Sequence, residues 1–250
     1  MPSPTPFRKV GLARALSKLG YCSRSQAAVL IRAGRVRVNE NVRRDPETPV
    51  RIDKDRLLVD DSAIDTPTKI YLMMNKPRGL VTTASDEKGR DTVYSLLDPS
   101  LPWLAPVGRL DKASEGLLLL TNDSEWSAKI AAPDTHLEKT YHVQISTVAN
   151  EKLARELVSG VTTEEGDTLR ARRATFLRSG QKNSWLEIIL DEGKNRHIRR
   201  MLAALDIEVL RLIRVAIGPL QLGKLAKGAH RPLTSDEKTM LDRAMQGKTQ

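Results

Sequence analysis

The sequence GRLDKASEGLLLLTND, residues 108–123, joins a loop of small and charged residues to four consecutive leucines. An apolar run of this length is typical of a buried element, so Leu117–Leu120 would anchor the loop in front of it. If Arg109–Leu110–Asp111 is extended, Leu110 points to the core while Arg109 and Asp111 share the opposite face. We therefore expect this stretch to present one carboxylate, that of Asp111, from a rigid support, as an enzyme presents a reactive acid.

The composition favours a packed protein with a polyanionic partner. The 250 residues, of which 40% are hydrophobic and 4% aromatic, can form two modest domains or one large one, with a mainly aliphatic core. The 41 lysines and arginines exceed the 31 acids, giving a net charge of +10. Such an excess indicates nucleic acid first and an anionic membrane second, with a merely solvated basic surface as the alternative.

Several classes of protein are disfavoured. The single cysteine, Cys22, excludes an internal disulfide framework and favours a reducing compartment. The four histidines lack ligand partners at metal-site spacing, so we expect no metal. No apolar run is long enough for a membrane span, and residues 1–8, which we expect to be flexible, lack a signal core. We expect a cytoplasmic protein that does not bind membranes.

Residues 9–66 predict a small α/β module. Leu12, Leu16 and Leu19 recur at helical spacing before Gly20, and Ser23 with Gln26 forms a capping box for a second helix. A strand follows at 35–38. The polar faces would carry six cations that can grip phosphates, namely Arg14, Lys18, Arg24, Arg32, Arg35 and Arg37. The alternative is a small helical domain with an ordinary solvated face.

Residues 67–247 predict a larger α+β domain on a mixed, mainly antiparallel sheet with flanking helices. Apolar and alternating runs indicate strands at 70–74, 139–145, 169–177, 185–190 and 209–217. Helical spacing and capping signals indicate helices at 124–132, 151–159 and 195–205, and a last one from about Thr234.

Three further residues could carry chemistry beside Asp111. Tyr141 lies on a predicted strand, Arg199 on the arginine-rich helix, and Lys76 in a Pro–Gly turn. Taken singly, each has an ordinary explanation: a half-buried strand tyrosine, a solvated or phosphate-facing arginine, and a turn lysine. An aspartate before a small-residue loop is likewise more often a turn or capping residue than a catalyst.

Together these motifs resemble a known family. The N-terminal pattern Ser23–Arg24 with Ala27, Ile31, Gly34, Val36, Val38 and Asn39 resembles the RNA-binding module of ribosomal protein S4. Further motifs, in the same order along the chain, resemble the rRNA pseudouridine synthases of the RsuA type: 75–79, 108–123, 139–143, 192–196 with 199–201, and 210–214 with 217–220. The resemblance covers nearly the whole chain. It departs at His197, where the family helix most often has glutamine.

The resemblance implies roles by position. Asp111 would be the essential acid, Tyr141 would stack on the target base, and Arg199 would pair with Asp111. Ile198 would pack beside the base, Arg109 would enter the RNA stack as the nucleotide is extruded, and Lys76 would form the site floor. Arg200 would contact the substrate.

The implied reaction is the isomerisation of uridine to pseudouridine in ribosomal RNA, free or within a subunit or assembly intermediate. The base is cut from the ribose, turns, and rejoins through carbon 5, so no cofactor is expected. Asp111 would either attack the sugar or abstract a proton from it, and the residues leave both routes open. We expect a monomer. The rival hypotheses are a catalytically silent rRNA-binding protein and a nucleic-acid glycosylase, which would release free base.

Overall fold

The computed structural model describes residues 9–64, 68–83 and 89–246. They form two compact units: an N-terminal unit up to Ile70 that includes 98–105 and 121–124, and a C-terminal unit made of the remainder. The expected flexible N-terminus at 1–8, and the expected domain boundary at residues 66 and 67, lie outside the described residues.

The N-terminal unit packs two helices against small sheets. The helices are α1 (Leu12–Lys18) and α2 (Arg24–Arg32), and the sheet order is β3 (Asn41–Arg43), β2 (Val36–Val38), β5 (Leu57–Val59), β6 (Ser62–Ala63). Separately, β1 (Val10–Gly11) pairs with β4 (Pro49–Val50). The predicted capping box is confirmed, because the Gln26 amide N–H donates to the Ser23 hydroxyl and the Gln26 side chain accepts from the Ser23 backbone.

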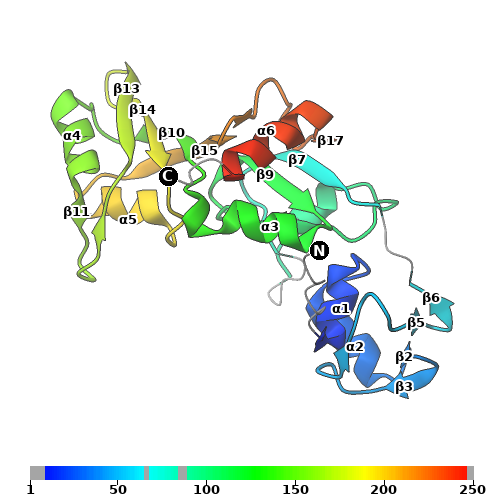
Figure 1. The fold of residues 1–250 in the computed structure, drawn as a ribbon. Coiled ribbons are helices and arrows are strands. Elements are labelled where there is room, and N and C mark those ends of the chain that lie inside the picture. The colour runs from blue at the N-terminus through cyan, green and yellow to red at the C-terminus, as the bar shows by residue number, and fades with distance from the viewer. Residues whose placement is uncertain (1–8, 65–67, 84–88, 247–250) are drawn as a thin grey trace, which may run out of the picture. The chain divides into compact units, whose positions relative to one another are not determined.

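The C-terminal unit is built on one long sheet (Figure 1). Its order is β13 (Arg173–Ser179), β14 (Ser184–Leu190), β10 (Lys139–Ile145), β15 (Val209–Ile217), β9 (Glu115–Thr121), β7 (Tyr71–Lys76), β17 (His230–Pro232). Two short strands join it, β8 (Ala105–Val107) on β9 and β16 (Leu220–Gln221) on β15. The β15–β9 pair is parallel and β15–β10, β10–β14, β13–β14 and β7–β17 are antiparallel, which confirms the mixed, mainly antiparallel sheet.

Helices pack on the sheet through two aliphatic cores. One core joins β10 and β14 to α4 (Glu151–Ser159) and α5 (His197–Ala203). The other joins β9 and β7 to α3 (Ser124–Ala131) and α6 (Ser235–Gln246). The chain also forms 3₁₀ turns at Val93–Leu96 and Pro133–Thr135 and a small hairpin of β11 (Val161–Thr162) with β12 (Thr168–Leu169). No helix in the described ranges is long and apolar enough to cross a bilayer.

Three sequence expectations need correction. The single strand predicted at 169–177 is two strands in different sheets, β12 and β13, and between them the Ala171 N–H donates to the Leu157 carbonyl of α4. Lys76 is the last residue of β7 rather than part of the Pro–Gly turn. The helix expected from residue 195 begins at His197, because Arg196 adopts a left-handed conformation with a φ of 47°.

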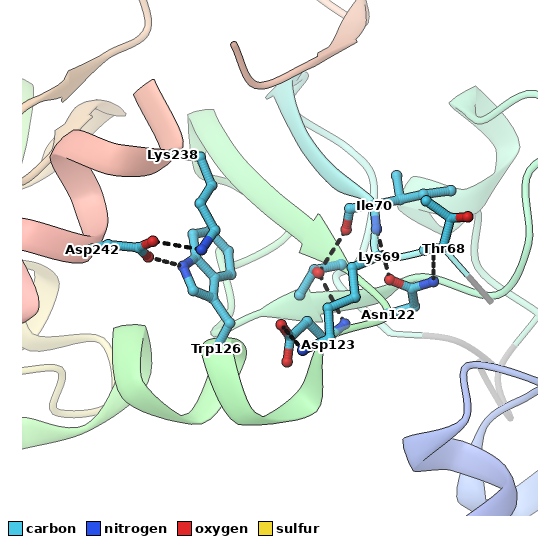
Figure 2. A network of polar contacts seen from close by, with 9 residues as sticks. Thr68, Lys69, Ile70, Asn122, Asp123, Trp126, Lys238 and Asp242 are labelled. Carbon is cyan, nitrogen blue, oxygen red and sulfur yellow. Dashed lines mark hydrogen bonds and ion pairs between the residues drawn. The ribbon is translucent and has the colours of Figure 1, made fainter. Parts of the chain in front are cut away.

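The end of the 108–123 stretch is held by its own polar side chains (Figure 2). The Asn122 amide accepts from the Ile70 N–H (2.8 Å) and donates to the Thr68 carbonyl (3.0 Å). The Thr121 hydroxyl donates to the Ile70 carbonyl (2.6 Å), and Asp123 pairs with Lys69 (2.8 Å). These contacts fix where β9 ends relative to the start of β7.

Strand β9 is buried along its whole length, and Leu117–Leu120 are each 0% exposed. Its contact with β15 depends on Gly116, which lies opposite Arg214 with a φ of +103°. A Cβ at this position would lie 2.2 Å from the Arg214 carbonyl oxygen. The two strands can therefore meet in this register only with glycine at position 116.

Gly116→Ala should lower the free energy of unfolding by more than the left-handed backbone alone explains. Gly79 is a matched control, because it has the same φ of +103° but no atom within 4 Å of its missing Cβ. We expect Gly79→Ala to cost about 1–3 kcal/mol and Gly116→Ala clearly more, because backbone atoms cannot move aside. Urea unfolding of both variants measures the difference, and equal losses would contradict the proposed contact.

Candidate active site

A cleft of about 630 Å³ opens in the C-terminal unit. Its walls are the loop before β9, the end of α3, residues 190–198, and strands β10 and β15. Four of the predicted site residues line it together: Arg109, Asp111, Tyr141 and Ile198. They come from segments up to 90 residues apart in the sequence. The fold therefore brings this group together, and proximity in the sequence does not.

The loop that carries Asp111 is held by its backbone carbonyls. Each carbonyl from Leu110 to Ser114 accepts a hydrogen bond from a donor elsewhere in the unit. The donors are the Thr82 hydroxyl for Leu110, the Lys76 ammonium for Asp111 and Ser114, the Gly79 N–H for Lys112, and the Arg199 guanidinium for Ala113. The loop is irregular in form but is as fully bonded as a strand, which makes it rigid.

Lys76 lies beneath this loop with 0% of its surface exposed. Its ammonium donates to the carbonyls of Pro77 (3.0 Å), Asp111 (3.1 Å) and Ser114 (2.9 Å). Burial lowers the pKa of Lys76 to about 8, although the nearby charges of Asp111 and Glu115 raise it in part. The lysine therefore acts on the backbone that positions Asp111.

Asp111 is half-buried, Arg109 is exposed and Leu110 is buried, the alternation expected for an extended segment. Arg199 approaches from α5, but its guanidinium donates to the carbonyls of Ala113 (3.1 Å) and Val209 (3.3 Å). Across the described ranges no ion pair within 4.0 Å joins Arg199 to Asp111. Burial and the charge of Arg196 lower the pKa of Arg199, and Asp111 raises it in part, so the two groups interact electrostatically without direct contact.

Tyr141 and Ile198 complete the apolar side of the cleft. Tyr141 lies on β10 directly opposite Arg214 of β15, and Ile198 is buried in the first turn of α5. The neighbouring His197 is 3% exposed, with its Nδ1 3.6 Å from a Glu192 carboxylate oxygen. Burial lowers the pKa of His197, which Glu192 raises in part, so this position offers an imidazole beside an acid.

Arg200 does not join this group. It is absent from the cleft lining and is bound by Glu165 and by Asp167 (2.5 Å), from the turn between β11 and β12. It is one residue, or about 100°, around the helix from Arg199 and so points to a different neighbour. Arg200 therefore lies outside the cleft, held by acids of the turn between β11 and β12.

The six cations of the N-terminal unit differ in their partners and exposure. Arg35 is bound by Asp60, and Arg37 lies 3.2 Å from Asp61. Arg14, Arg24 and Arg32 are exposed, with no acid within ion-pair distance in the described part of the chain, and Lys18 of α1 is half-buried. Arg14, Arg24 and Arg32 are therefore the cations most available to a phosphate.

Two basic residues of the cleft wall, Lys139 and Arg214, are not among the site residues predicted from the sequence. Neither is Glu115, which is 3% exposed and is bound by Arg211 and Lys227. Burial alone would raise the pKa of Glu115, but these two cations outweigh it and hold the pKa below its ordinary value. The sequence does contain a sign of these residues. Arg211 and Arg214 interrupt the apolar run of β15, where an unpaired charge is costly.

Comparison with known proteins shows the family to which the chain belongs. The RNA pseudouridylate synthase family matches residues 70–204, and the S4 domain matches residues 10–57. A ribosomal large subunit pseudouridine synthase B of Bacillus subtilis is 34% identical over 228 residues, covering 90% of this chain and 93% of its own. An RNA pseudouridine synthase of Aquifex aeolicus is 35% identical over 242 residues, covering 95% of each chain.

A solved structure agrees with these matches. The crystal structure of a pseudouridylate synthase is 29% identical, with a TM-score of 0.66, and covers 93% of this chain and 99% of its own. An RNA-binding module followed by a sheet domain with an acid-bearing cleft defines an enzyme that acts on RNA. The chain belongs to the RNA pseudouridylate synthases of the RsuA type, isomerases that convert uridine to pseudouridine in RNA.

Lys76 predicts a pH dependence of stability. Its folded pKa of about 8 lies below the ordinary value of 10.5. Below pH 8 the folded protein carries the full cost of the buried charge. Between pH 8 and 10.5 the folded state loses this proton before the unfolded state does, so the free energy of unfolding should rise by up to about 3 kcal/mol. Urea unfolding of the wild type and Lys76→Met at pH 7.5 and 10 isolates the effect, and parallel changes would contradict it.

Proposed function

We propose that this enzyme converts uridine to pseudouridine in ribosomal RNA, with Asp111 as the essential carboxylate acting on an extruded uridine. The observation that carries the proposal is the Asp111 loop itself. Its carbonyls are all bonded from within the unit, and it presents one half-buried carboxylate to a cleft that also holds an aromatic ring. Positioning of this kind supplies a large part of catalysis.

Two observations favour ribosomal RNA as the substrate. The Bacillus subtilis relative that aligns over most of both chains is named for the large ribosomal subunit. The S4 domain and the net charge of +10 fit a long, structured polyanion better than a small substrate. We propose that residues 9–66 hold the RNA and that residues 67–247 carry out the chemistry.

Asp111 must be ionised to act, whether it attacks carbon 1′ of the ribose or removes the proton from carbon 2′. Cations near a carboxylate favour its charged form. Arg199 from α5 and Lys76 from β7 donate to carbonyls of the same loop, and the favourable interaction of each with Asp111 partly offsets the cost of its own burial. Their role is thus to hold the loop and to place positive charge near Asp111.

The base must leave the RNA stack before it can reach Asp111, at a cost of a few kcal/mol. Arg109 is exposed at the cleft and can occupy the space that the nucleotide leaves. Stacking on Tyr141 would return about 1–3 kcal/mol. Ile198 would keep the base in place from the apolar side.

Asp111→Asn should abolish pseudouridine formation, a drop of at least about 10³-fold, because an amide neither attacks the sugar nor accepts its proton. The side chains have nearly the same shape, so the dissociation constant for RNA should change by less than about twofold. Site-resolved pseudouridine mapping of rRNA from cells carrying only the variant measures the loss. Asp134→Asn removes the same charge from an exposed acid and should leave the modification intact; retained modification in Asp111→Asn would refute the assignment.

The N-terminal unit should bind phosphates mainly through its unpaired arginines. Replacing Arg24 and Arg32 by glutamine should weaken RNA binding and lower the slope of log K against log salt by about 0.7–0.9 for each lost phosphate contact. The control is Arg35→Gln with Asp60→Asn, which removes an ion pair without changing the net charge. Filter binding at several salt concentrations compares them. Equal slopes for the two double variants would refute the assignment of Arg24 and Arg32.

A further inference from the structure

Arg214 is a buried cation with unused hydrogen-bonding capacity. It is 6% exposed and lies on the cleft wall. Its Nε donates to the Leu117 carbonyl (2.7 Å), but its buried Nη2 has no hydrogen-bond partner. Among the residues that the structure describes, no acid lies within ion-pair distance of it. A buried, unpaired guanidinium nitrogen is costly, so it indicates a group that is supplied from outside the chain.

Lys139 is a second cation on the same wall. It lines the cleft and forms no ion pair in the described segments. Burial lowers its pKa, the charge of Arg214 lowers it further, and Asp191 raises it in part. Asp191 itself contacts Arg172 (3.4 Å), and Glu192 contacts Lys194 (3.3 Å), so two of the three acids that line the cleft already have basic partners. The wall therefore carries an excess of positive charge.

A β-bulge brings these groups to one face. Thr140 pairs with Ala216 while Tyr141 pairs with Arg214, so Val215 is an extra residue in β15. Without the bulge, Arg214 and Ile217 would point to opposite faces of the sheet; with it, both line the cleft. Because Lys139 pairs with Ile217 and Tyr141 with Arg214, the two cations flank the position of the proposed stacking ring.

The chemistry of the reaction explains what such a wall would bind. If Asp111 attacks carbon 1′, a carbon–oxygen bond forms and the C1′–N1 bond breaks, and its electron pair leaves with the base. If Asp111 takes the proton from carbon 2′, that C–H pair forms the C1′=C2′ double bond, and the C1′–N1 pair again leaves with the base. By either route the detached uracil is an anion whose charge is shared among N1, O2 and O4.

We propose that Arg214, assisted by Lys139, binds the detached uracil anion through a carbonyl oxygen. The inference rests on the proposed function. Fixed charges aimed at developing negative charge in a dry site are among the strongest catalytic effects available. A backbone phosphate is a poorer fit, because the Nη2 atom is buried while the RNA backbone stays outside, where Arg109 and Arg196 are exposed.

The symmetry of uracil suits a fixed donor. A half-turn about the axis through N3 and C6 exchanges N1 with C5 and O2 with O4. The turn therefore moves C5 to face the sugar, as the product requires, and places O4 where O2 had been. A guanidinium that does not move can hold the base before and after this turn, so the wall keeps the anion in the cleft while it reorients.

The test separates the chemical step from RNA binding. Under single-turnover conditions Arg214→Gln should slow pseudouridine formation by about 10²–10³-fold, while its dissociation constant for RNA and the salt slope stay at wild-type values. Arg214→Lys should recover at least about tenfold of that rate, because it keeps the charge. Lys139→Gln should slow the reaction by about tenfold. The control, Arg178→Gln, removes one cation from β13, outside the cleft, and should react at the wild-type rate.

Two results would overturn the proposal. One is a folded Arg214→Gln that reacts at the wild-type rate. The other is weaker binding with the salt slope reduced by about 1 and an unchanged chemical step, which assigns Arg214 to a phosphate. If Arg214→Gln does not fold, as circular dichroism would show, the same comparison is decided with Arg214→Lys and Lys139→Gln, each of which must slow the chemical step alone. A wild-type enzyme that forms no pseudouridine in rRNA would instead refute the proposed function.

Discussion

The geometry of the site depends on the buried ammonium of Lys76. An ammonium inside a protein costs several kcal/mol unless its hydrogens are used, and here three carbonyls accept from it, two of them in the Asp111 loop. The negative charges of Asp111 and Glu115 offset the remaining cost in part. The lysine therefore holds the backbone that positions Asp111, and the two opposite charges attract each other through space without touching. A loop can be irregular and still rigid when its carbonyls are bonded in this way.

The parallel contact of β9 with β15 positions the cleft wall that carries Tyr141 and Arg214, as Lys76 positions the Asp111 loop. Gly116 allows the two backbones to approach, and the Arg214 side chain then reaches across to the Leu117 carbonyl of β9. The same contact sets the loop before β9 beside the wall that carries Tyr141 and Arg214. The bulge at Val215 turns the cationic side chain into the cleft. One close contact between strands thus fixes the distance between the acid and the groups that would receive the base.

The sequence predicted the elements that depend on local pattern. The bounds of β10, α4 and β15 agree with the predicted ones, because period-2 and period-3.6 patterns with clear stops leave little choice. Lys76 was placed in a turn because Pro77 and Gly79 follow it, and nothing local shows that β7 continues to that residue. The resemblance implied a substrate contact for Arg200, which follows Arg199 in the same motif, but the helix points the two side chains to different partners. The proposed role of Arg214 depends on the β-bulge at Val215 and on a buried Nη2 atom that has no hydrogen-bond partner. Neither feature can be predicted from the spacing of residues in the sequence.

The cations around Asp111 differ in what they are already bonded to, and this difference divides their work. Lys76 and Arg199 donate to backbone carbonyls, so they are committed to the loop and can influence the acid only through space. Arg199 and Arg214 each keep one buried guanidinium nitrogen without a partner, but Arg199 also donates to the Ala113 carbonyl of the loop, whereas Arg214 donates to Leu117 of β9. In the proposed reaction, negative charge would pass from the carboxylate, beside cations that hold the loop, to the base, beside Arg214 with its unpartnered Nη2. A site with only Lys76 and Arg199 would place positive charge beside the carboxylate and so favour the reactant. The proposed contact of Arg214 with the base is what would favour bond cleavage.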